Sequence, residues 1–420
     1  MSSSSSSSAT ESETAGDAAH YYFFTPLAST QTYLMDVDLN LVHLWESETN
    51  PGVGASLLPG GDLLRSGVVG AKFNFAGAGG LVERQTWEGE VLWTFVYSDA
   101  QHRQHHDIEP MPNGHVLMVA WELRPPMEAA AAGRNPATID KLRGLWPDTI
   151  VELDPATQSV VWEWRVWDHL VQDFAPDLAN YGDPGDHPEL IDLNHVDPTF
   201  AMLADWNHVN GIDYHPGLDQ IVISAHHFSE LWIIDHGTTT AEAAGHVGGA
   251  RGRGGDLLYR WGNPAAYRQG TPEDRRLFHQ HDPRWVKDGI PGAGDLTIFN
   301  NGEIGARPYS TVEQITPPLA DDGTYTMSGA TFGPDTWTTY TADPPASFFS
   351  QIVGGVQRLA SGDALVTEGD IGRAFEIDPS GTILWEYIHG AGVFHFDRVD
   401  ADGPELAGRV LTPLGPVPGG

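Results

Sequence analysis

The sequence predicts an all-β fold, a six-bladed β-propeller, from three observations. Glycine-containing turns followed by apolar strands recur along the chain, acidic turns followed by tryptophan-rich strands recur between them, and the two ends of the chain each carry part of one further unit. Repeated units that hold four short antiparallel strands are typical of propeller blades. A pair of β-sandwiches is the alternative fold for so many short strands.

The first half of each unit is a glycine-containing turn that leads into a strand. A turn of this kind beside alternating or continuous apolar residues predicts a β-hairpin. Five such segments occur: PGGDLLRS (59–66), PNGHVLMVAWE (112–122), HPGLDQIVIS (215–224), GAGDLTIFNNG (292–302) and ASGDALVTEG (360–369).

The second half of each unit is an apolar run, an acidic turn and a strand that contains tryptophan. The examples are GLVERQTWEGEVLWTF (80–95), IVELDPATQSVVWEWRV (150–166), LWIIDH…GDLLYRWGN (231–263) and AFEIDPSGTILWEYI (374–388). Residues 32–47 show this half alone, and residues 392–413 carry the missing inner strands. Pairing of the N- and C-terminal strands in one blade would close the ring and remove exposed sheet edges.

The domain boundaries follow from composition. Residues 1–19 are polar and rich in serine, which predicts a disordered tail, and residues 20–420 are expected to form a single propeller domain. Two segments, 123–147 and 167–203, interrupt the strand pattern with helical and loop signals. Long connections in a β-fold often carry binding functions, so we expect both insertions on one face, over the same mouth of the ring.

The charge balance excludes two classes of partner. Lys and Arg number 22 against 57 Asp and Glu, which gives a net charge of −35. Such a surface repels nucleic acid and anionic membranes, and the sequence contains no long apolar stretch that predicts a membrane span. An acidic, lysine-poor surface fits a halophilic or marine source, and a high-GC genome is the alternative explanation.

The chain has no cysteine, which excludes disulfides, thiolate metal ligands and cysteine nucleophiles. Its N-terminus lacks the basic and apolar regions of a secretory signal. We therefore expect a cytoplasmic protein, or a secreted or periplasmic one if a signal has been removed.

Histidines cluster at equivalent places in three units, just before the innermost strand. The clusters are QHHDIEPMPNG (104–114) with His105 and His106, DWNHVNGIDYHPG (205–217) with His208, and FHQHDPRWVKDGIPGAG (278–294) with His279 and His281. In a propeller these positions face the central channel, so the side chains should converge. His226 in SAHHFSELWIID (224–235) should join them, whereas His227 should point away if the strand is regular.

The order and spacing of these motifs resemble one family. A tryptophan and HVN, then IVIS followed by histidine, then QHD before GDLTIFNNG are similar to the bacterial arylsulfate sulfotransferases. The segments TYLMDVDLNLVHLWES, WDHL…DHPELIDLN and GDIGRAFEIDPSGTILWEY are similar as well. The resemblance covers nearly the whole chain from about residue 20.

The resemblance implies a propeller that moves a sulfuryl group from an aryl sulfate to a phenol with ping-pong kinetics, without a nucleotide donor or other cofactor. His281 matches the family nucleophile, His106 and His208 match the histidines that contact the sulfuryl oxygens, and Asn210 matches the asparagine beside them. Further substrate contacts are expected from His105, Trp206 and Phe278, the last two at the mouth of the channel. Asp107 and Asp282, which follow their histidines directly, could fix tautomers.

One departure from the family pattern keeps other functions open. His226 stands where the family usually has arginine, and a histidine supplies a charge only conditionally. Four channel histidines, His106, His208, His226 and His281, could instead bind a divalent transition metal for oxygenase or hydrolase chemistry. A non-catalytic, ligand-binding propeller is the third possibility.

Overall fold

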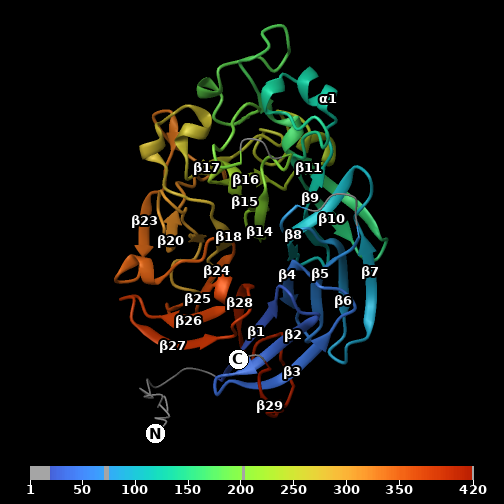
Figure 1. Ribbon diagram of the computed structural model, residues 1–420, viewed down its shortest axis with the longest axis vertical. Helices are drawn as coiled ribbons and strands as arrows, with labels where there is room; N and C mark the ends of the chain where they lie inside the picture. The colour runs from blue at the N-terminus through green and yellow to red at the C-terminus, as the bar shows by residue number, and fades with distance from the viewer. Residues whose placement is uncertain (1–18, 71–74, 201–203, 419–420) are drawn as a thin grey trace.

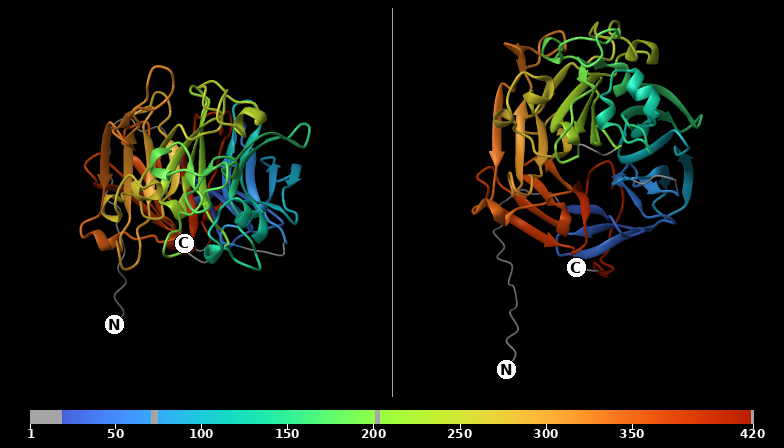
Figure 2. Two further views of the ribbon diagram at one scale, coloured as in Figure 1. Left: turned by 90° about the horizontal axis from the view of Figure 1, so that it is seen from above. Right: turned by 45° about the horizontal axis from the view of Figure 1, so that its top comes forward.

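The computed structural model describes residues 19–70, 75–200 and 204–418, and it shows six small β-sheets arranged in a ring (Figure 1). Figure 2 shows the molecule from two further directions, and in its right-hand view the sheets surround a common centre. The predicted six-bladed propeller is confirmed. Of the predicted Ser-rich tail, only Ala19 lies within the described residues.

The strands of each blade follow one another from the centre of the ring outwards. The first blade holds β28 (Val393–Asp400), β1 (His20–Pro26), β2 (Gln31–Asp36), β3 (Asn40–Glu46) and β29 (Gly415–Pro416). The second holds β4 (Pro51–Leu57), β5 (Leu63–Val68), β6 (Gly80–Gln85) and β7 (Val91–Val96), and the third holds β8 (His102–Pro110), β9 (Val116–Glu122), β10 (Asp148–Asp154) and β11 (Ser159–Arg165).

The other three blades follow the same order. The fourth holds β14 (Val209–His215), β15 (Gln220–Ala225), β16 (Glu230–Asp235) and β17 (Tyr259–Trp261). The fifth holds β18 (His281–Trp285), β19 (Leu296–Asn300), β20 (Thr311–Thr316) and β23 (Thr336–Tyr340), and the sixth holds β24 (Gly354–Arg358), β25 (Ala364–Glu368), β26 (Arg373–Ile377) and β27 (Ile383–Ile388). All five predicted glycine turns join the two innermost strands of a blade.

The ring closes between the two ends of the chain. β28 pairs antiparallel with β1, with Phe24 opposite Phe396, and this pairing gives both strands a neighbour. Only one inner strand comes from residues 392–413, because the chain then crosses to the outer edge of the blade, where Gly415 in β29 pairs with Leu41. An unpaired strand edge invites association with other chains, so β29 protects the outer edge that it covers.

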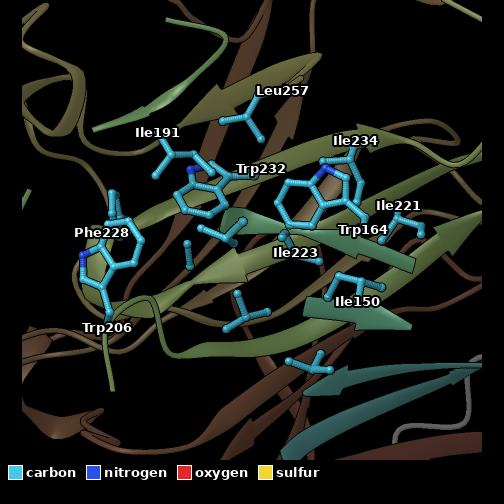
Figure 3. Close-up of a cluster of buried hydrophobic side chains, with 14 of the residues drawn as sticks. Ile150, Trp164, Ile191, Trp206, Ile221, Ile223, Phe228, Trp232, Ile234 and Leu257 are labelled. Atoms are coloured by element: carbon cyan, nitrogen blue, oxygen red, sulfur yellow. The ribbon is translucent and has the colours of Figure 1, made fainter. Parts of the chain in front are cut away.

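Apolar side chains fill the space between neighbouring blades. The largest cluster, between the third and fourth blades, contains Trp164, Trp232, Ile221 and Ile223, all fully buried (Figure 3). Burial of a side chain of this size contributes about 1.5–3 kcal/mol. The blades are therefore rigid supports for the side chains that face the channel.

The two predicted insertions contact each other. The first contains the helix α1 (Pro126–Ala131), and the second contains the short strands β12 (Leu170–Val171) and β13 (Ile191–Asp192). Arg134 donates to the carbonyl of Leu193, and Asn180 donates to the carbonyl of Ala132.

Two further insertions were not predicted. One lies between β16 and β17 and carries α2 (Thr240–Ala243), and the other, in the fifth blade, carries β21 (Met327–Ser328) and β22 (Thr331–Phe332). None of the described helices is long and apolar enough to cross a membrane.

Candidate active site

Bulges in three inner strands place the histidines. The pairing register shifts between Gln104 and Ile108 in β8, between Val209 and Ile212 in β14, and between His281 and Arg284 in β18. A bulge bends its strand and redirects a side chain. Four residues at or beside these bulges have positive φ angles, which are uncommon outside glycine: His106 (48°), His208 (51°), His279 (57°) and Asp282 (50°). Backbone strain of this kind gathers at functional sites.

The four predicted histidines converge in the channel. The ring centroids lie 4.5 Å apart for His106 and His208, 5.0 Å for His208 and His226, and 5.3 Å for His226 and His281. His279 also belongs to this group, since its ring stacks on His226 at 4.9 Å. Segments from three neighbouring blades thus each provide histidines to one cluster, as the repeat predicted.

The prediction for His227 is wrong. β15 ends at Ala225, and His226–Phe228 form a 3-10 turn that ends at Ser229 with a positive φ of 55°. Side chains alternate between faces only in a regular strand. The turn therefore brings both histidines to the cluster, where the His227 ring stacks on His208 at 4.7 Å.

His208 forms a pair with a carboxylate that the sequence did not single out. Its Nδ1 lies 2.5 Å from Oδ2 of Asp205, and Oδ1 of Asp205 accepts a hydrogen bond of 2.9 Å from the indole of Trp121. Burial opposes ionisation of Asp205, but the contact with His208 lowers the pKa of this carboxyl overall. An ionised carboxylate only accepts hydrogen bonds, so His208 donates from Nδ1 and directs Nε2 away from Asp205.

His281 is held by the amide of Asn301. Its Nδ1 lies 2.7 Å from Oδ1 of Asn301, whose Nδ2 donates to the carbonyls of Ser350 and Val353. Because the amide nitrogen is used there, only the amide oxygen faces the ring, and Nδ1 of His281 must carry the proton. The lone pair is then on Nε2. Burial lowers the pKa of His281 to about 3, so the ring is neutral at pH 7.

His105 supports His106 from behind. It is fully buried, stacks on Trp121 at 3.7 Å, and lies 2.8 Å from both Asp148 Oδ1 and His106 Nδ1. This position differs from the predicted contact with substrate. The His106 ring packs so closely on Gly77 that a Cβ there would lie 2.1 Å from it, so position 77 requires glycine.

The other predicted contacts occupy different places. Asn210 is fully buried and donates to the carbonyl of Gln280, which joins the fourth blade to the fifth. Trp206 belongs to the core and not to the mouth: it is buried against Phe228 and donates to the carbonyl of His195 (Figure 3). A core tryptophan and a pocket tryptophan are indistinguishable in one sequence, because both sit in apolar surroundings.

Phe278 lies beside the histidines and between two cations. It is half-buried, with the guanidinium groups of Arg275 and Arg307 at 4.5 and 5.2 Å from its ring centre. Arg275 also reaches His279, at 3.4 Å from Nε2, and His279 contacts Asp197 of the second insertion at 3.2 Å. Sequence reasoning missed both arginines, which lie in loops without a recurring pattern.

The C-terminal halves of the inner strands line a cavity of about 740 Å³ at the opposite end of the channel. Its aspartates bond to backbone amides of the next blade. Asp107 accepts from Ile212, and Asp282 accepts from Val356. These two carboxylates join blades, and they do not fix histidine tautomers as predicted.

The channel histidines do not have the spacing of a metal site. Among the described residues, one group has three ligand atoms within 4.8 Å of one another, and it consists of His169, His246 and Asp256, outside the channel. The predicted alternative ligand set of His106, His208, His226 and His281 is not such a group in this structure.

Fold and site together define a β-propeller with a buried histidine centre in its channel. The family model Arylsulfotransferase (ASST) matches residues 71–399, and the chain belongs to this family. No curated protein matches the chain. Among solved structures, a protein of unknown function from Bacteroides caccae is 10% identical with a TM-score of 0.50, and the match covers 91% of this chain and 99% of that chain. The periplasmic gluconolactonase PpgL of Pseudomonas aeruginosa is 11% identical with a TM-score of 0.46, covering 90% and 99%. At 10% identity, the similarity to the Bacteroides caccae protein shows the fold alone.

Proposed function

We propose that this protein transfers a sulfuryl group from an aryl sulfate to a phenol through a covalent sulfohistidine on His281. Membership of the family supports sulfotransferase activity in general. The observation that carries the finer proposal is the hydrogen bond from His281 Nδ1 to Asn301, because it leaves the Nε2 lone pair free on a neutral ring.

In the first step, Nε2 of His281 attacks the sulfur of the donor. The N–S bond forms as the S–O bond to the aryl group breaks, and the electron pair leaves with the phenolate. The ring keeps its Nδ1 proton and becomes positively charged. The side-chain amide oxygen Oδ1 of Asn301, 2.7 Å from Nδ1, stabilises this charge.

Neighbouring histidines stabilise the charge on the sulfuryl oxygens. Sulfuryl transfer resembles phosphoryl transfer, where negative charge is spread over the equatorial oxygens in a loose transition state. Nδ1 of His226 is buried and has no hydrogen-bond partner among the described residues, so it is available to an oxyanion. Burial lowers the pKa of His226, and a bound anion would act in the opposite direction. His226 thereby supplies part of what the family's arginine supplies.

The His208–Asp205 pair moves the proton. The departing phenolate has a parent pKa near 10 and needs a proton, which Nε2 of His208 can give while the carboxylate of Asp205 supports the charged ring. In the second step His208 takes the proton of the acceptor phenol. The acceptor oxygen attacks the sulfur, the N–S bond breaks, and the electron pair returns to Nε2 of His281.

The test is a burst experiment with p-nitrophenyl sulfate, with and without phenol. We expect one equivalent of p-nitrophenol in the burst, a mass increase of one sulfuryl group on His281, and turnover that depends on phenol. His281→Asn should abolish all three signals, whereas His215→Asn, at the C-terminal end of β14, should retain them. Full activity in His281→Asn would refute the proposed nucleophile.

A further inference from the structure

Three side chains with metal-binding chemistry meet at the outer part of the ring, between the third and fourth blades. His169 follows β11 by four residues, and His246 and Asp256 lie in the insertion between β16 and β17. Oδ1 of Asp256 lies 2.9 Å from Nδ1 of His169 and 2.7 Å from Nδ1 of His246. One oxygen therefore faces two imidazole nitrogens from separate segments of the chain.

The orientation of His169 is fixed on its other side. Its Nε2 lies 2.8 Å from the carbonyl oxygen of Ala243, and its ring stacks parallel to the fully buried Trp164. A carbonyl oxygen only accepts, so Nε2 carries a proton. In the neutral ring the lone pair of Nδ1 then points at Oδ1 of Asp256, and two electron pairs face each other unless a proton or a cation lies between them.

A backbone contact of this kind is the usual support of a metal-binding histidine. Metal ligands of this type donate their second ring N–H to a carbonyl or carboxylate, which fixes the tautomer and the direction of the free nitrogen. Gly255 shows how closely the backbone packs here, since a Cβ would lie 2.0 Å from the Ala243 oxygen and 2.6 Å from Nε2 of His169. The support is therefore built into the fold.

We propose that His169, His246 and Asp256 bind one divalent transition-metal ion through Nδ1, Nδ1 and Oδ1. Two imidazoles and a carboxylate suit zinc and similar ions, whereas calcium and magnesium prefer sites made of oxygen. The His246 side chain is 58% exposed, which leaves room for water as a fourth ligand. The net charge of −35 favours the approach of cations.

Small movements would adapt the group to an ion. Metal–ligand distances of about 2.0–2.1 Å in a tetrahedral site place neighbouring donors about 3.3 Å apart. The present separations of 2.9 and 2.7 Å must therefore widen by roughly half an ångström. Because His169 stays fixed by Ala243 and Trp164, the carboxylate of Asp256 must turn away from it, and the exposed His246 can follow.

The ion would fasten two insertions together. His169 begins the insertion that continues through β12 and β13 to Asp197, the partner of His279 in the channel. Leu257, next to Asp256, already donates to the carbonyl of Glu189 in that insertion. An ion that binds to the folded chain, and not to the unfolded chain, stabilises the fold by mass action. The proposed site is therefore structural, and it stabilises the segment that reaches the histidine cluster.

The experiment measures metal binding by the full chain after removal of metals with a chelator. Equilibrium dialysis with Zn²⁺ should give one tightly bound ion, and Co²⁺ should give the visible absorption of a four- or five-coordinate site. His246→Gln and Asp256→Asn should weaken binding by about tenfold or more and remove the rise of Tm that Zn²⁺ causes. His246 is exposed, so its replacement leaves the fold intact.

Two controls locate the ion. His187→Gln removes an exposed histidine that contacts Glu189 without a third ligand, and it should bind metal like the unchanged chain. His226→Gln alters the channel cluster and should also keep the ion. Loss of the ion in His226→Gln, or equal binding by the unchanged chain and His246→Gln, would overturn the proposal. Neither result depends on sulfuryl transfer.

Discussion

The histidine cluster and the 740 Å³ cavity lie at opposite ends of the channel, and the pKa values of histidines at these two ends shift in opposite directions. At the histidine end, burial lowers the pKa of His281 to about 3 and lowers the pKa of His226 as well. At the cavity end, burial also acts to lower the pKa of His395, but Asp397 at 3.0 Å has the stronger influence, and the pKa of His395 is raised overall. Burial alone therefore does not decide the pKa of a buried histidine: Asp397 raises the pKa of His395, whereas burial keeps the pKa of His105 low although Asp148 lies 2.8 Å away.

The same contrast applies to the other charges. The cavity end holds Arg284 between Asp282 and Asp397, at 2.8 and 2.5 Å, and His395 faces Asp397 as well, so two carboxylates are matched by two basic groups. The histidine end holds rings that are neutral or paired with a single aspartate, such as His208 with Asp205. A neutral, preorganised pocket can take up the charge of a sulfuryl group, whereas the balanced end serves to join the blades.

The largest expected effect follows from neutralising Asp205, the carboxylate that contacts His208. Asp205→Asn preserves the shape but not the charge, so His208 loses support as the proton donor. We expect the turnover number for aryl sulfate to fall by about 10³-fold. The loss should be smaller for p-nitrophenyl sulfate than for phenyl sulfate, because p-nitrophenolate is the better leaving group and depends less on a proton donor. An equal loss for both donors would indicate that Asp205 only supports the fold.

A change at the cavity end should affect stability and spare the chemistry. Arg284→Met leaves the buried Asp282 without its cation and leaves Asp397 with His395 alone, which costs about 3 kcal/mol in the free energy of unfolding. Urea denaturation measures this loss. The turnover number below the unfolding transition should stay within a factor of about two, since the change corresponds to less than 0.5 kcal/mol. A large loss of turnover would contradict the separation of the two ends.

The tautomer of His281 can be tested at Asn301. Asn301→Leu removes the acceptor for Nδ1–H, and we expect sulfuryl transfer to fall by about 10²-fold with little change in the KM for the donor. Asn301→Asp places a carboxylate against His281, as at the cavity end. It should raise the pKa of His281, so that the acid limb of kcat/KM moves to higher pH. No movement of this limb would show that His281 is not the group that titrates.

The smallest effect is the dependence of stability on pH. His281 and His227 have pKa values of about 3 when folded and about 6.5 when unfolded, so below pH 6.5 the unfolded chain binds more protons. Stability should therefore fall as the pH falls from 6.5 towards 3, by about 2 kcal/mol for each histidine at pH 5. His281→Asn should reduce this fall by one such increment in urea denaturation. A profile identical to that of the unchanged chain would show that His281 is not buried as a neutral ring.

Much of the fold could be predicted because each blade repeats a local pattern. The five glycine turns form the inner hairpins of the second to sixth blades, and the two half-units at the ends of the chain complete the first blade. The outer strands of the fifth blade were missed, because β20 and β23 are separated by an insertion that holds β21 and β22 in place of an acidic turn. Repeats predict strands well where they are uninterrupted.

The candidate site was predictable only where it follows the repeat. His106, His208 and His281 sit at equivalent places of their blades, and the structure brings them together. The groups that orient them come from elsewhere: Asn301 from the following hairpin, and Asp205 from the loop before β14. Their roles depend on distances across the channel, which a single sequence does not contain.

The pairing of β28 with β1 has a consequence for synthesis of the protein. β28 is synthesised after every other inner strand of the ring and forms an inner wall of the channel, where Phe394 lies 6.2 Å from the ring of His281. A nascent chain that stops before β28 therefore holds the whole histidine cluster in an open arc of blades. Activity should begin only when translation passes Asp400, so the order of synthesis delays the chemistry until the ring is complete.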